Sequence, residues 1–173
     1  YARANGLNRV VVGSAEARIG IITAGKSFAD TMQALAEMGL DAEGAGIAVL
    51  KLGMVFPLDP EAVVKLAAGK TTLLVIEEKR PLIENQVKAT LFDAALPEAP
   101  KVLGKALLSA VGELAPNVIA HAIAKVLGNE SLAVEVPLAP AMKFDANGRP
   151  VLGPMRLPFF CSGCPHNTST RVP

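Results

Sequence analysis

The feature that most constrains the fold is a repeated pairing of a short apolar, β-branched run with an amphipathic segment. The apolar runs are RIGIITA, GIAVLKL and TTLLVIEE, at residues 18–24, 46–52 and 71–78. The segments with helical spacing that follow them are bounded by Gly or Pro and occupy residues 26–38, 59–69 and 81–96. Strands that alternate with helices form a parallel sheet covered on both faces.

Two further elements extend this pattern. An apolar piece at residues 101–104 predicts a fourth strand, and residues 116–128 predict a helix that begins at Pro116 and ends at Gly128. The RVVV run at residues 9–12 is either an extra edge strand or part of a linker. We therefore predict an α/β fold with three layers and a mostly parallel sheet, like a Rossmann fold.

The composition changes near residue 136 and suggests a division of the chain. Seven of the 13 prolines fall in the last 38 residues, and DANGRP at residues 145–150 is a cluster of turn formers. We expect a linker or edge strand over residues 1–17, a domain over 18–135, and an extended connector over 136–173. The connector has no core of its own in this interpretation.

The composition also excludes several classes of function. The formal net charge is +1 without a basic block, and aromatic residues make up 4%, which argues against nucleic acid as a partner. The apolar runs are far shorter than the ~20 residues of a membrane helix, and no secretory leader is visible. With only two cysteines, we expect a cytoplasmic protein. Because the chain begins without Met, we interpret it as a piece of a longer protein.

One stretch fits a phosphate-binding pattern. GIITAGKS, residues 20–27, has Gly20, Gly25, Lys26 and Ser27 at the spacing of a P-loop, and the later run LLVIEE resembles a magnesium-holding strand. However, Ile-Ile-Thr between the glycines favours extended structure. If Gly20 lies within a strand, the two glycines are roughly 17 Å apart and cannot form one anion-binding nest.

The turn itself leaves two interpretations open. Gly25, Lys26 and Ser27 either attract an anion at the start of a helix, or Gly25 simply makes the turn. In the second interpretation, which we favour, Ser27 or its neighbour caps the helix and Lys26 is solvated.

Charged residues follow the third strand at the edge of a sheet where ligands or partners commonly dock. Glu77, Glu78, Lys79 and Arg80 are consecutive, with Glu84 and Asn85 close behind. They form either an ion-pair network at an interface or a solvated cluster. No nucleophile or Ser/His/Asp triad accompanies them, and His121, within an apolar helix, is expected to be a packing residue.

The tail PFFCSGCPHNTSTRVP carries the most specific chemistry. Cys161 and Cys164 form a C-x-x-C that suits zinc, an iron–sulfur cluster or a redox dithiol, and His166 offers a third zinc ligand. Two reduced cysteines without a metal are the remaining alternative. A four-ligand site needs further ligands, and the cysteines of this chain do not provide them.

Four segments together resemble the large fused indolepyruvate ferredoxin oxidoreductases, which belong to the thiamine-diphosphate-dependent 2-oxoacid:ferredoxin oxidoreductases. These segments are GIITAGKSFADTMQAL, KLGMVFPLDP, VIEEKRPLIENQVKATLF and FCSGCPHNTST. The resemblance covers roughly residues 7–173. It implies a transketolase C-terminal-like domain, followed by the start of a thiamine-diphosphate and iron–sulfur domain.

The resemblance also implies a role. The family decarboxylates arylpyruvates oxidatively with coenzyme A and reduces ferredoxin, using thiamine diphosphate, magnesium and a [4Fe–4S] cluster. Cys161 and Cys164 match two of the four cluster ligands in relatives. The segments that hold thiamine diphosphate and magnesium are absent from this sequence, so we expect no catalytic or cofactor-binding residue here. The implied role is structural packing against other domains of the same polypeptide, in a parent enzyme that is a homo-oligomer.

Two other classes remain as alternatives. A stand-alone P-loop-like nucleotide-binding domain predicts magnesium-dependent ATP binding through Lys26. A small zinc-binding interaction module predicts stoichiometric zinc that depends on Cys161.

Overall fold

The structure is a computed structural model that describes residues 1–14, 16–128, 143–144 and 150–151. The chain divides into two compact units, Tyr1–Leu138 and Ala139–Pro173.

The first unit is built on one sheet of five strands, in the order β1-β3-β2-β4-β5. Strand β1 runs antiparallel to β3, and the other pairs are parallel. The strands are β1 (Arg9–Val12), β2 (Ile19–Ala24), β3 (Ile47–Leu52), β4 (Thr72–Ile76) and β5 (Lys101–Leu103). The helices are α1 (Gly25–Glu37), α2 (Pro60–Ala67), α3 (Leu82–Ala94) and α4 (Pro116–Leu127).

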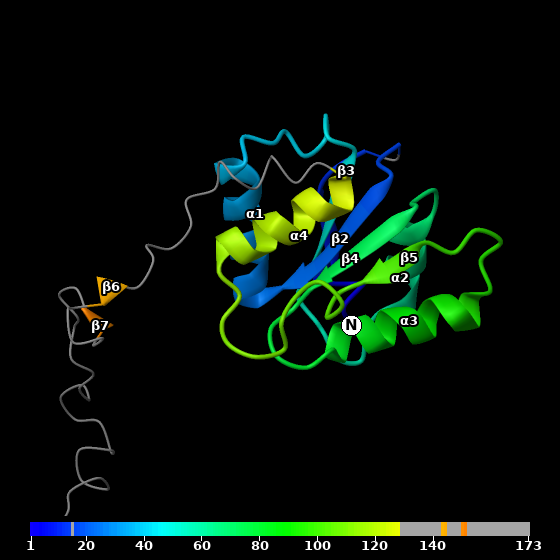
Figure 1. Cartoon of the computed structure of the whole chain (residues 1–173). Helices are drawn as coiled ribbons and strands as arrows, with labels where there is room; N and C mark the ends of the chain where they lie inside the picture. The colour runs from blue at the N-terminus through cyan, green and yellow to red at the C-terminus, as the bar shows by residue number, and fades with distance from the viewer. Residues whose placement is uncertain (15, 129–142, 145–149, 152–173) are drawn as a thin grey trace, which may run out of the picture. The chain divides into compact units, whose positions relative to one another are not determined.

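The central strands are apolar on both faces because helices cover both faces. Figure 1 shows α1 and α4 on one face of the sheet and α2 and α3 on the other. Successive residues of a strand point to opposite faces, so Ile21 packs toward α1 and α4 whereas Ile22 packs toward α2 and α3. The structure therefore has the three-layer α/β architecture that the alternating pattern predicts.

Local sequence explains how the helices begin and end. The side chain of Asp59 caps α2 by accepting a hydrogen bond from the N–H of Glu61 at 3.2 Å, and Pro60 occupies the first helical position, as predicted. Gly69 and Gly128 follow α2 and α4 with φ angles of 71° and 70°, a conformation that glycine adopts without strain.

Strand β1 lies at the open edge of the sheet and contains an irregularity. Arg9 pairs with Lys51 and Val10 with Leu50, but the register shifts before Val12. Gly13 follows so close to β3 that a Cβ there would overlap the backbone of Ala48. Because paired residues share a face, Val10 lies on the α2 face and Arg9 on the α1 face.

The second unit contains a two-stranded antiparallel pairing of β6 (Lys143–Phe144) with β7 (Pro150–Val151). These strands flank the segment in which the sequence predicts a turn. Cys161, Cys164 and His166 lie outside the described residues.

Candidate functional site

The carboxyl ends of β2, β3 and β4 bring the sequence motifs together at one edge of the sheet. The β2–α1 turn, the β3–α2 loop and the β4–α3 loop meet there around a hollow of about 460 Å³. It is lined by Ala24, Gly25, Lys26, Ser27, Leu52, Gly53, Val55, Glu77 and Glu78. The phosphate-like pattern and the acidic segment are therefore neighbours in space.

The P-loop-like pattern does not form a phosphate cradle. Gly20 lies inside β2 and pairs with Ala48 and Leu73, and a Cβ there would meet the side chain of Leu73 at 2.5 Å. Gly25 alone makes the turn, with a φ angle of 54°. The prediction that Gly20 belongs to a strand is confirmed, and the two glycines do not close one nest.

The prediction for the start of α1 is wrong in two details. Ala24 precedes the helix and no side-chain hydrogen bond caps it, while Ser27 is buried. Lys26 is half-exposed but is not simply solvated, because its Nζ lies 2.7 Å from Asp30, 3.0 Å from Glu113 and 3.9 Å from Glu78. Local spacing signals only Asp30, one helical turn away; the other two partners require the fold.

These carboxylates place negative charge around the β2–α1 turn. A hydrogen bond with Asp30, followed by one with Glu113, raises the pKa of Lys26 above its ordinary value. An anion at the start of α1 would have to displace or approach three negative charges. The favoured interpretation, in which Gly25 makes a turn without holding an anion, agrees with this arrangement.

Glu77 supplies hydrogen-bond acceptors at the start of α3. Its carboxylate accepts hydrogen bonds from the N–H groups of Ile83 at 2.8 Å and Glu84 at 2.9 Å, and the side chain is buried. The ammonium of Lys105 donates to the carbonyl oxygen of Glu77. Glu77 thus supplies acceptors to two free N–H groups at the beginning of the helix. The sequence does not signal this role, because Glu77 precedes the helix by more residues than a capping box allows.

Glu84 connects α3 to the end of β5. Its carboxylate, only 5% exposed, accepts hydrogen bonds from the N–H of Lys105 at 2.8 Å and from Lys88 Nζ at 2.6 Å. Burial raises the pKa of Glu84, but hydrogen bonds from Lys88 and Lys105 outweigh it, so the pKa is lowered overall. Gly104 lies against this carboxylate, and a Cβ there would overlap Glu84 Oε2.

Gln86 connects α3 to the β3–α2 loop. Its Oε1 accepts from the N–H of Leu58 at 3.0 Å, and its Nε2 donates to the carbonyl oxygens of Val55 and Leu82 at 3.0 Å each. Hydrogen bonds of Gln86 therefore join the segments KLGMVFPLDP and EEKRPLIENQ.

The charged segment was predicted to be either an ion-pair network at an interface or a solvated cluster. Neither alternative describes it fully, because Glu77 and Glu84 are buried whereas Lys79 and Arg80 are exposed.

Two further predictions concern His121 and the pair of cysteines in the tail. His121 is exposed on α4, so the expectation of a packing role is wrong; the apolar helix places it on the solvent side. Cys161 and Cys164 lie outside the described residues, and among those described there is no group of three or more His, Cys, Asp or Glu side chains placed to hold a metal. Within that same part of the chain, no helix is long and apolar enough to cross a membrane.

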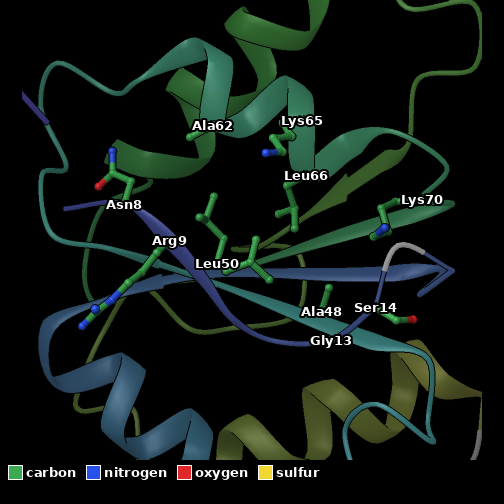
Figure 2. A pocket seen from close by; sticks show the side chains of 11 residues that line it. Asn8, Arg9, Gly13, Ser14, Ala48, Leu50, Ala62, Lys65, Leu66 and Lys70 are labelled. Carbon is green, nitrogen blue, oxygen red and sulfur yellow. The ribbon is translucent and has the colours of Figure 1, made fainter. Parts of the chain in front are cut away.

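A second hollow, which no motif predicted, lies beside β1 on the α2 face of the sheet. It has a volume of about 500 Å³. Figure 2 shows α2 above it and β3 below it, with Asn8 at one end and Ser14 and Lys70 at the other. It is lined by Asn8, Arg9, Val10, Gly13, Ser14, Ala48, Leu50, Ala62, Lys65, Leu66 and Lys70.

Two solved structures share this fold. A 2-oxoglutarate:ferredoxin oxidoreductase from Magnetococcus marinus aligns with 69% of this chain and 19% of that chain, at 15% identity and a TM-score of 0.50. A split-gene transketolase, described as an inactive β4 tetramer, aligns with 72% of this chain and 42% of that chain, at 21% identity and a TM-score of 0.51. The fold is therefore the α/β fold of transketolase C-terminal-like domains.

Sequence comparison identifies the family within this fold. The indolepyruvate oxidoreductase domain family matches residues 9–144. The indolepyruvate oxidoreductase subunit IorA of Pyrococcus abyssi is 34% identical over 161 residues, and that of Methanothermobacter thermautotrophicus is 30% identical over 162 residues. Each alignment covers 92% of this chain and 23% of the relative. The chain belongs to the indolepyruvate oxidoreductase domain family and spans about a quarter of the length of these relatives.

Proposed function

We propose that this chain is a structural domain of a cytoplasmic oxidoreductase that decarboxylates arylpyruvates oxidatively, indolepyruvate among them. The parent enzyme transfers the acyl group to coenzyme A and reduces ferredoxin. The domain itself breaks no bond; it supports the packing of other domains and of subunits. The names of the relatives support the substrate class, and the β4 tetramer of the split-gene transketolase supports self-association.

One observation carries the structural role: two of the three acidic residues of EEKRPLIENQ, Glu77 and Glu84, are already engaged in internal hydrogen bonds. Glu77 accepts from two N–H groups of α3, and Glu84 accepts from Lys88 and from the backbone of Lys105. A catalytic carboxylate must reach a substrate or a water molecule. These two side chains are buried against the fold, which supports a structural use of the segment.

The proposal assigns the tail cysteines to the cofactor of the parent enzyme. Cys161 and Cys164 would supply two of the four thiolates of a [4Fe–4S] cluster, since a C-x-x-C suits such ligation. Thiamine diphosphate with magnesium would be held by other parts of the parent, and would supply the carbanion chemistry.

The test uses the full-length oxidoreductase that carries this segment, together with the 173-residue chain. We expect Cys161→Ser to lower the iron content of the full-length protein and its indolepyruvate-dependent reduction of ferredoxin. The matched variant Ser162→Ala, at the next position of the sequence, is expected to keep both. Indolepyruvate oxidation by the 173-residue chain alone, or full iron content in the Cys161→Ser protein, would contradict the proposal.

A further inference from the structure

We propose that the hollow beside β1 binds an organic anion with an apolar body, that is, a carboxylate, phosphate ester or sulfonate attached to a short aliphatic or aromatic group. Its volume of about 500 Å³ falls within the range of about 300–1,000 Å³ that is usual for small-molecule sites. The site is distinct from the carboxyl edge and does not depend on the proposed function.

The floor of the hollow is apolar, which is the reason to expect an apolar part in the ligand. Val10 on β1 and Leu50 on β3 face each other in register, and Leu66 on α2 lies across from Leu50 (Figure 2). Val10 is 50% exposed, although it is adjacent to the buried core residue Leu50. An apolar group placed here would remove this surface from water and so favour binding.

The polar side chains that line the hollow differ in kind: Asn8, Lys65 and Lys70 carry donors, and Ser14 can donate or accept. Asn8 Oδ1 already accepts from the N–H groups of Gly53 at 3.0 Å and Met54 at 3.2 Å. Asn8 Nδ2 is buried and has no hydrogen-bond partner among the described residues. The ammonium groups of Lys65 and Lys70 can only donate. Because the ammonium of Lys65 is exposed and can only donate, it favours a ligand that brings acceptor oxygens.

The charge of the hollow has the same sign throughout its lining. Lys65 and Lys70 contribute positive charge, and no Asp or Glu is among the described residues that line it. Arg9 contributes little, because its side chain points away from α2 toward the opposite face of the sheet (Figure 2). Two carboxylates lie just outside the lining: Glu16 near Lys70, and Glu43, which accepts from the N–H of Gly13 at 3.3 Å. Lys65 is therefore the lining charge that favours an anion.

Lys65 is the residue on which recognition of the anion depends most. Lys70 Nζ donates to the carbonyl oxygen of Ala68 at 3.4 Å, and Glu16 lies near enough to Lys70 to feel its charge. Lys65, by contrast, has no ion pair or hydrogen bond within the described part of the chain, and it is exposed on the last turn of α2. A long flexible side chain at this position can move its ammonium onto a bound anion.

The experiment follows the amide signals of the 173-residue chain by NMR during titration with naphthalene-1-sulfonate. We expect saturable shifts at the amides that line the hollow, such as those of Val10, Ser14 and Leu66. Lys65→Gln should weaken binding ~10-fold, because it removes one charge-assisted hydrogen bond from the complex. Lys125→Gln is the matched control, since Lys125 occupies the corresponding last-turn position of α4.

Two further ligands separate the parts of the proposal. Neutral naphthalene-1-sulfonamide should bind more weakly by a similar factor, and inorganic sulfate should give no saturable shifts in the hollow. Equal binding of the sulfonate and the sulfonamide would overturn the requirement for an anion. Equal binding of sulfate would overturn the requirement for an apolar body. Absence of saturable binding, or equal weakening by Lys65→Gln and Lys125→Gln, would overturn the site.

Discussion

The carboxyl edge of the sheet and the hollow beside β1 differ in how the fold engages their lysines. At the carboxyl edge, charged groups from distant segments are paired with one another: Lys26 with three carboxylates, and Glu77 with the start of α3. In the hollow, Lys65 has no ion pair or hydrogen bond within the described residues. A buried atom without a hydrogen bond occurs in both regions, Asn8 Nδ2 in the hollow and Glu78 Oε1 at the carboxyl edge.

The difference shows that a conspicuous sequence motif does not mark a region that is free to bind. The carboxyl edge contains GIITAGKS and EEKRPLIENQ, yet its buried acids hold loops and helices in place. The hollow contains no motif, because its lining comes from β1, β3 and α2, which are separated along the chain. Lys65 is available there because no ion pair or hydrogen bond within the described residues engages it.

The largest expected effect tests whether the carboxyl edge is structural. Glu77→Ala should lower the free energy of unfolding by about 2–4 kcal/mol, because it leaves two N–H groups of α3 without an acceptor in a buried place. Urea denaturation followed by circular dichroism measures the change. The neighbouring variant Glu78→Ala should have a much smaller effect, since Glu78 Oε1 accepts no hydrogen bond within the described residues and lies 3.9 Å from Lys26 Nζ. Equal losses in the two variants would refute a special role of Glu77.

A smaller loss of stability is expected from a change that crowds the carboxylate of Glu84. Gly104→Ala should cost about 1–3 kcal/mol, because the new Cβ displaces the Glu84 carboxylate from the N–H of Lys105. The cost should shrink when Gly104→Ala is introduced into a Glu84→Ala protein, where the carboxylate is absent. A double-mutant cycle by urea denaturation measures this coupling. Additive losses in the cycle would mean that Gly104 is required for another reason.

The smallest expected effect concerns nucleotide binding. Calorimetry with ATP and magnesium should give no saturable heat for the unmodified chain, because Gly20 is held in β2 and Lys26 is surrounded by Asp30, Glu78 and Glu113. Lys26→Ala should leave this result unchanged. Micromolar ATP binding that disappears in Lys26→Ala would show that the carboxyl edge is open, and the contrast with the hollow would fail.

Much of the fold could be predicted from the sequence because its signals are local. The β-branched run around Ile21 and Ile22 predicted a buried strand, and Asp59-Pro60 predicted the start of α2. The same local rules fail at the start of α1, where they predict a cap from Ser27 or its neighbour, and at His121, for which they predict packing. In both cases, the side of the helix that meets the sheet decided the outcome, and spacing alone did not reveal it.

The candidate sites were less predictable because their contacts span long sequence separations. Lys26 and Glu113 meet only after α4 and its preceding loop are placed, and Asn8 meets Gly53 across β1 and β3. No local pattern records such pairs. Cys161 and Cys164 lie outside the described residues, so their role as cluster ligands stays a prediction.

By itself the sequence determined where strands and helices follow one another along the chain, since their positions depend on periodicity, caps and turns within short windows. The tertiary structure alone decided which polar groups form hydrogen bonds or ion pairs within the fold and which do not. Whether Glu77, Lys26 or Lys65 has a partner depends on residues brought together by the sheet. A hydrogen bond or ion pair requires proximity in space, and the spacing of letters in the chain does not specify it.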